Sequence, residues 1–168
     1  GKYSFYNCTN LVGPIHINNA DIQQSAFEGC IAPIQGLIIT SRNQGIIIFE
    51  RAFYNSGINC PLTLNSFINK IHEYAFSHCF NLKNHPITIH ANHICSYAFS
   101  NCGLLQKHIT IHSELISIYA FHDTNFNSLT IKNSHQSHNQ IVIGTNAFYS
   151  SRFNGAVTIE GNILIEPY

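Results

Sequence analysis

Six cysteines give this chain its most versatile side chains, because a thiol can form a disulfide, bind a metal or act as a nucleophile. Cys60 and Cys95 stand alone, and no Cys-x-x-Cys pair, the spacing typical of zinc and redox sites, occurs. The other four each follow a phenylalanine by three positions, an apolar context in which a free cysteine packs as a small hydrophobic residue. We predict reduced thiols in the core, with a Cys79–Cys102 bridge as the alternative. The four are Cys8, Cys30, Cys79 and Cys102.

Eleven histidines are the second group with chemical potential, since imidazole binds metals and titrates near neutral pH. His90 and His112 each follow an apolar-x-apolar triplet and should be neighbours after folding, and His93 is nearby in the sequence. Two histidines without a carboxylate make a weak metal site, so we predict solvated polar surface here, and neither a metal nor a cofactor. Acidification toward about pH 5 should charge the exposed histidines and make the protein cationic.

Catalytic motifs are missing from the sequence. It holds no His-Glu-x-x-His, no Gly-x-Ser-x-Gly and no phosphate-binding glycine loop, so we do not expect an enzyme. Only 10% of the residues are charged, and eight basic residues balance eight acidic ones, which leaves no basic surface for nucleic acid or an anionic membrane. The longest apolar run, residues 45–49, is also far shorter than the roughly 18 residues of a membrane-spanning helix.

An internal repeat must position these residues. The dipeptide Ala-Phe recurs six times after a degenerate Ser4-Phe5, and successive phenylalanines stand 22 to 27 positions apart. An isoleucine precedes the phenylalanine of each Ala-Phe pair by five positions. Such a period is the signature of a solenoid, in which each repeat buries its apolar side against its neighbours. The pairs are Ala26-Phe27, Ala52-Phe53, Ala75-Phe76, Ala98-Phe99, Ala120-Phe121 and Ala147-Phe148, and the isoleucines are Ile22, Ile48, Ile71, Ile94, Ile116 and Ile143.

Each repeat also contains an apolar-x-apolar triplet after its phenylalanine. The alternation and the β-branched residues predict one short strand per repeat, with two side chains pointing inward and one outward. The predicted fold is a β-dominated solenoid of about seven turns of 22–27 residues, with a parallel β-sheet on one face and at most a short 3₁₀ turn around each Ala-Phe. The triplets begin at Ile15, Leu37, Leu62, Ile87, Ile109, Leu129 and Val157.

The outward positions of the triplets predict a candidate binding face. Most are threonines, which suit exposed strand positions and also stabilise a sheet through cross-strand contacts. A flat, polar and uncharged face suits a hydrated interface with another protein. Tyr74, Tyr97 and Tyr119 form a second column, interpreted equally as half-buried packing or an exposed aromatic strip. The candidate face consists of Thr63, Thr88, Thr110, Thr130 and Thr158, flanked by Asn65, His90, His112 and Lys132.

The string Ile-x-x-Tyr-Ala-Phe-x-x-Cys-x-x-Leu, followed by Ile-Thr-Ile, is most complete in residues 71–89 and 94–111. It resembles the leucine-rich repeats of the BspA-like family over nearly the whole chain, although Ser56, Thr124 and Ser151 replace the cysteine. The resemblance implies a leucine-rich-repeat solenoid from a bacterium or a parasitic protist, used for adhesion to host proteins or other cells. It therefore also implies an extracellular or cell-surface location.

Residues 1–168 are interpreted as a single solenoid domain without recognisable caps. The sequence opens within a repeat, at residues 3–8, and closes on residues 163–165, which resemble residues 141–143. Two alternatives to a simple binding module therefore stay open: copies that stack head to tail into a filament, or a fragment of a longer array. An intracellular scaffold is a further alternative, because core thiols suit a reducing compartment.

Overall fold

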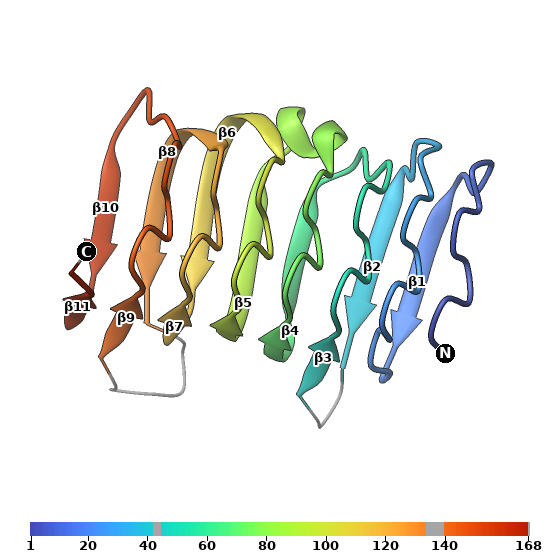
Figure 1. Ribbon diagram of the computed structural model, residues 1–168, viewed down its shortest axis with the longest axis horizontal. Coiled ribbons are helices and arrows are strands. Elements are labelled where there is room, and N and C mark those ends of the chain that lie inside the picture. Colours follow the sequence, from blue (N-terminus) through green and yellow to red (C-terminus); the bar gives the residue numbers. More distant parts are fainter. Residues whose placement is uncertain (42–44, 134–139, 168) are drawn as a thin grey trace.

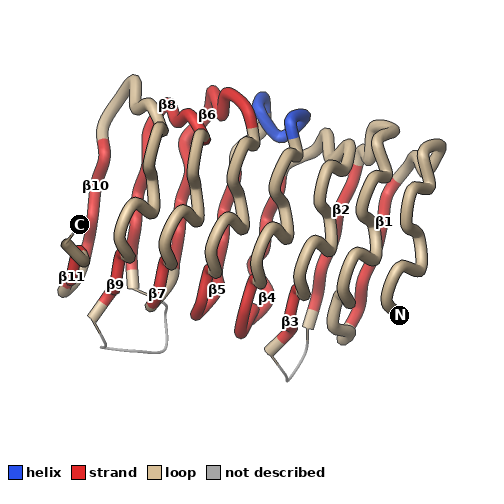
Figure 2. The backbone as a smooth tube through the Cα atoms, viewed as in Figure 1, coloured by secondary structure: helices blue, strands red, loops and turns tan. Residues whose placement is uncertain are grey.

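The computed structural model describes residues 1–41, 45–133 and 140–167, and these residues form a parallel β-solenoid (Figure 1). Each turn corresponds to one sequence repeat, and the turns follow one another along the long axis from the N-terminus to the C-terminus. Within the described ranges the one helical element is a 3₁₀ turn, η1 (Phe80–Asn84), and strands and loops make up the rest (Figure 2). The predicted β-dominated solenoid, with close to seven turns, is confirmed.

The strands form two parallel columns along the solenoid. The first column contains the predicted triplets, which pair from one turn to the next, as Ile87 does with Ile109. The second column contains the isoleucines that precede each Ala-Phe, where we predicted core packing but no strand. Strands β4 and β5 run through both columns. The first column holds β1 (Pro14–Asn18), β2 (Gly36–Thr40), β4 (Leu62–Ile71), β5 (Ile87–Ile94), β6 (Gly103–His112), β8 (Thr124–Lys132) and β10 (Val157–Glu160); the second adds β3 (Ile46–Ile48), β7 (Leu115–Ile116), β9 (Ile141–Ile143) and β11 (Ile163–Ile165).

The first column is interrupted between β2 and β4, so the predicted parallel β-sheet is divided into two sheets. Strands β1 and β2 form a two-stranded sheet, and the remaining strands form a nine-stranded sheet. Across the interruption, isolated bridges such as Ile34–Ile58 still join successive turns. The break coincides with the repeat that carries extra residues after Thr40 in the sequence.

Stacked phenylalanines occupy the centre of the solenoid. The rings of successive Ala-Phe pairs stack with centroids 4.9 to 5.2 Å apart and with planes within 10° of parallel. Phe53 and Phe76 are fully buried, as are the isoleucines Ile48, Ile71 and Ile94. Each internal repeat therefore buries its aromatic ring between the rings of its two neighbours, which a single repeat could not do alone.

A side-chain hydrogen bond explains the small polar position three residues after each phenylalanine. In five turns its thiol or hydroxyl donates to the phenylalanine carbonyl of the preceding turn, whereas the Ser56 hydroxyl lies 3.4 Å from the Cys79 sulfur of the next turn. The distance is 3.2 Å from Cys102 to Phe76 and 2.7 Å from Thr124 to Phe99. Cysteine, threonine and serine all carry a donor on the γ atom, so they exchange freely at this position. All six thiols are free, which confirms the prediction of reduced cysteines, and all except the half-buried Cys8 are buried. The other pairs are Cys30 with Phe5, Cys79 with Phe53 and Ser151 with Phe121.

Two left-handed residues per turn allow the backbone to bend around each phenylalanine. They lie two positions before and two positions after the ring, as Tyr97 and Asn101 do around Phe99, with φ of 59° and 54°. This conformation costs a residue with a Cβ atom about 1–2 kcal/mol. Asn, Asp and Gly tolerate it best, and the later position uses Gly29, Asn101 and Asp123 in different turns.

Candidate protein-binding face

The threonine column lies on one face of the nine-stranded sheet. Register pairs Thr63 with Thr88, and the same alignment continues through Thr110, Thr130 and Thr158. The inward neighbours of each threonine in its triplet are buried from β4 to β8, so these threonine side chains point away from the core. Thr63 and Thr158 are exposed, whereas the three central threonines are half-buried between their neighbours. The predicted outward column is thus assembled in the order expected from sequence.

A second column runs beside the threonines, two positions further along each strand. Register aligns His90 with His112, His112 with Lys132, and Lys132 with Glu160. Lys132 forms an ion pair with Glu160, with 3.0 Å between Nζ and a carboxylate oxygen. Both side chains are substantially exposed, so this pair adds little stability and mainly sets local charge. Asn65 was predicted for the same column, but its side chain lies outside the described ones.

The histidine pair differs from its prediction. The rings of His90 and His112 stack with centroids 4.1 Å apart, which confirms that they are neighbours. His112, however, is only 9% exposed, so the expectation of solvated polar surface is wrong for this residue. Parallel strands about 4.8 Å apart hold equivalent rings at stacking distance. The His112 ring is the more covered of the two because it lies between His90 on β5 and Lys132 on β8. His90 remains half-buried and offers more of the pair to a partner than His112 does.

His93 belongs to a different part of the molecule. It lies in the second strand column, where its Nε2 atom is 2.9 Å from the Ser117 hydroxyl. Burial, together with the nearby Lys70 ammonium, lowers the pKa of His93 below its ordinary value. His93 is close to the His90–His112 pair in the sequence, but β5 pairs with β6 as far as His90 and with β7 from His93, so the residues belong to different strand columns.

A shallow depression marks the break in the first column. It has a volume of about 570 Å³ and lies between β2 and the start of β4. Its lining combines Ile38, which is 46% exposed, with Pro61 and Thr63. The threonine face therefore ends in a partly apolar hollow that the sequence did not reveal, because the triplet pattern continues through it without interruption.

The tyrosine column lies on the opposite side of each turn from the triplets, in the turns before the phenylalanines. Tyr74, Tyr97 and Tyr119 stack with centroids 5.1 Å apart. Tyr74 is 36% exposed, and the other two are half-buried. Because the rings stack face to face, they present edges rather than open ring faces, which supports packing as one of the two predicted roles.

Thiol chemistry is suppressed in the interior. Burial raises the pKa of the Cys79 thiol to about 11 and raises that of Cys102 well above its ordinary value. A thiol, rather than a thiolate, is a poor nucleophile, so these cysteines serve packing and hydrogen bonding. Their donor roles toward Phe53 and Phe76 are consistent with this assignment.

Comparison with known families identifies the repeat. The sequence matches the BspA type leucine rich repeat region family in six copies, over residues 1–124 and 114–165. The chain therefore belongs to the BspA-type leucine-rich repeat family, a repeat architecture associated with protein interactions rather than catalysis and often with cell surfaces. No curated protein and no solved structure gives a significant match. Across the described part of the chain, no helix is long and apolar enough to cross a membrane.

Proposed function

We propose that this chain is a recognition module that binds another protein through its threonine face. The observation that carries the proposal is the in-register column Thr63, Thr88, Thr110, Thr130 and Thr158, flanked by the column of His90, His112, Lys132 and Asn65. Five strands spaced about 4.8 Å apart span roughly 20 Å, which is wide enough for the core of a standard interface.

The chemistry of the face favours a hydrated contact of moderate affinity. Its centre is hydroxyl and imidazole, and its described charges, Lys132 and Glu160, already form an ion pair. Such a face gains little from long-range electrostatic steering, so affinity must come from hydrogen bonds, bridging water and shape. The depression beside Thr63 would accommodate an apolar side chain of the partner and so provide an anchor.

The proposed biological setting is adhesion at a cell surface, with a host or neighbouring cell protein as partner. Family membership supports this setting, because repeats of this type are often surface-associated. The scarcity of charge also supports a protein partner over nucleic acid.

The test compares two charge-matched double variants of the fluorescently labelled chain on intact epithelial cells and on immobilised matrix proteins. Thr88→Lys with Thr110→Lys adds two charges to the face, and Asn59→Lys with Ile118→Lys adds two at exposed positions outside the strands. We expect the face variant to lose at least ten-fold in binding while the control retains it. Equal loss in both variants, or in neither, would contradict the assignment of the face.

End-to-end association is a second candidate, favoured by the apolar side chains on the terminal turns. Phe5 and Tyr6 are 44% and 46% exposed at one end, and Val157 and Ile165 are 47% and 62% exposed at the other. A cavity of about 380 Å³ beside Phe153 lies among these last side chains. A further turn would cover them, whether from a longer chain or from a second copy. Light scattering across a concentration series tests this candidate, because association predicts a mass that grows with concentration and a constant monomer mass contradicts it.

A further inference from the structure

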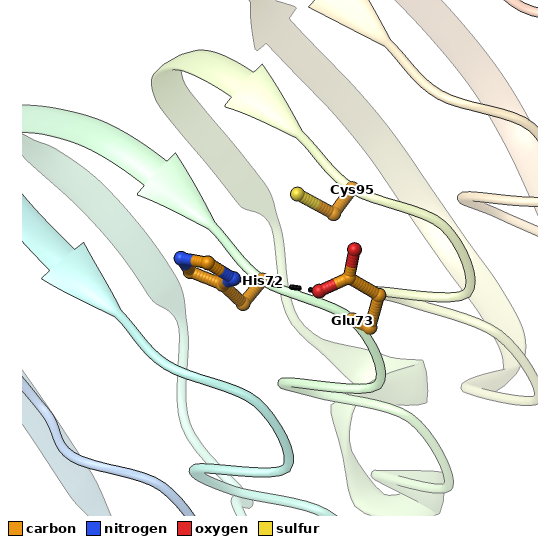
Figure 3. Close-up of side chains that lie close together, drawn as sticks. All are labelled: His72, Glu73 and Cys95. Atoms are coloured by element: carbon orange, nitrogen blue, oxygen red, sulfur yellow. Dashed lines mark ion pairs between the residues drawn. The ribbon is translucent and has the colours of Figure 1, made fainter.

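His72, Glu73 and Cys95 bring three metal-binding atoms together at one corner of the solenoid (Figure 3). His72 and Glu73 follow the end of β4, and Cys95 follows the end of β5. Because Ile71 pairs with Ile94, the register places His72 and Cys95 in equivalent positions of successive turns. One ligand atom from each of the three residues lies within 4.8 Å of the other two.

The spacing of the first two ligands matches a tetrahedral metal site. Zinc bonds to nitrogen and oxygen are about 2.0–2.1 Å long, so two such ligands lie about 3.3 Å apart at the tetrahedral angle. The Nδ1 atom of His72 and a carboxylate oxygen of Glu73 are 3.4 Å apart. A zinc–sulfur bond of about 2.3 Å puts the sulfur about 3.5 Å from the other two ligands. The three atoms, which lie within 4.8 Å of one another, would therefore draw together on binding.

Surrounding contacts hold the ligands in place. The His72 ring stacks on Phe49, with centroids 5.2 Å apart and planes 7° from parallel. The backbone N–H groups of His72 and Cys95 each donate to a carbonyl of the preceding turn, at 2.8 and 2.9 Å. Cys95 is only 2% exposed, whereas the His72 and Glu73 side chains are 25% and 46% exposed. An ion would therefore enter from the solvent side and retain water as its fourth ligand.

We propose that His72, Glu73 and Cys95 form a zinc site, with water in the fourth coordination position. Imidazole, carboxylate and thiolate together suit a borderline ion such as Zn²⁺ better than the hard ions Mg²⁺ or Ca²⁺. The site follows the second strand column, so it is separate from the threonine face.

Binding exchanges a proton for the ion. Burial, with a contribution from the Glu73 charge, raises the pKa of the Cys95 thiol to about 11, and the metal must displace this proton to form a zinc–sulfur bond. Lys70, which hydrogen-bonds Cys95, and His93 are the other titratable groups facing the cluster. The positive charge of Lys70 opposes the ion, whereas the lowered pKa of His93 favours its neutral form. Affinity should rise with pH because binding releases the thiol proton.

Cobalt provides the direct test, because Co²⁺ occupies zinc sites and reports a thiolate ligand by a near-ultraviolet charge-transfer band. We titrate the purified, reduced chain with Co²⁺ and then with Zn²⁺. The site predicts one Co²⁺ per chain, a thiolate band, visible bands of a four-coordinate ion, and loss of all these bands when Zn²⁺ is added. Absence of the thiolate band in the folded protein overturns the proposal.

Variants identify the ligands. Cys95→Ser should abolish the thiolate band, whereas Cys102→Ser should retain it, because serine preserves the donor to the Phe76 carbonyl. Glu73→Gln, at a half-exposed position that should not affect folding, should weaken Co²⁺ binding at least ten-fold without removing the band. Circular dichroism establishes that each variant is folded. A band that survives Cys95→Ser or disappears in folded Cys102→Ser contradicts the assigned ligand set. Unchanged Co²⁺ affinity in Glu73→Gln contradicts it as well.

Discussion

The interior of this solenoid and its threonine face are built by the same repeat but tolerate different changes. Inside, the third position after the phenylalanine of each Ala-Phe pair holds only cysteine, serine or threonine, and most of these donate a hydrogen bond to the preceding turn, as Cys102 and Thr124 do. On the face, the flanking column changes from His90 to Lys132 to Glu160, with no shared chemistry. The interior is therefore constrained by stacking between turns, whereas the flanking column varies in charge and size.

The largest expected difference between the two regions concerns aromatic residues. Phe76 is fully buried in the ring stack, whereas Phe80 in η1 is 50% exposed. Phe76→Ala should cost about 3–5 kcal/mol of the free energy of unfolding, because it leaves a cavity between two rings. Phe80→Ala should cost well under about 1 kcal/mol. Denaturant unfolding followed by circular dichroism measures both, and similar costs would remove the distinction.

Replacing threonine by valine in both regions measures what the hydrogen bonds between turns contribute to stability. Thr124→Val removes the hydroxyl that donates to the Phe99 carbonyl at 2.7 Å, whereas Thr110→Val changes the face. Leaving a buried carbonyl unsatisfied costs about 1–3 kcal/mol, so Thr124→Val should destabilise the protein by that amount. Thr110→Val should alter stability by less than about 0.5 kcal/mol. The unfolding midpoints of the two variants test this prediction. A larger loss of stability from Thr110→Val than from Thr124→Val would contradict it.

The left-handed turn positions should give a smaller effect. Asn101 has a φ of 54°, which asparagine tolerates better than alanine. Asn101→Ala should therefore cost about 1 kcal/mol, whereas Asn127→Ala, at an exposed position outside the left-handed set, should be close to neutral. Thermal unfolding of both variants provides the comparison, and an Asn101→Ala protein as stable as the wild type would argue against conformational strain at this turn.

Acidification should weaken the interior gradually. Burial lowers the pKa of His78 and His93 in the folded state, so the unfolded chain binds protons more readily. Stability contributed by these neutral histidines is present above their ordinary pKa of about 6.5 and is lost as the pH falls toward the lowered folded value. The denaturation midpoint should decrease between pH 7.5 and 5, and His93→Gln should flatten this decrease. A midpoint that rises on acidification would have the wrong sign for this account.

Much of the fold was predictable because the repeat specifies it redundantly. The Ala-Phe pairs predicted the stacked core, and the triplets predicted both the first strand column and the neighbouring His90 and His112. The second strand column was missed, although the alternation in residues 141–143 and 163–165 was a usable signal. Short apolar runs do not distinguish a strand from other core packing by periodicity alone.

The remaining errors have a different physical origin. The burial of His112 depends on what the neighbouring strands cover, which the sequence of one repeat does not reveal. Cys95 meets His72 only through the register of successive turns, and neither residue belongs to a motif. Contacts of this kind depend on which residues are aligned when successive turns stack. That alignment can be predicted only when the length of each turn is known.

The central claim is that the threonine face, rather than the tyrosine column, contacts the partner. A photo-reactive benzoylphenylalanine placed at Thr110 in one preparation and at Tyr97 in another tests this directly on cells that bind the wild-type chain. We predict covalent capture of a partner protein from position 110 and little or none from position 97. Capture from position 97 alone would contradict the account and assign recognition to the opposite side of the solenoid.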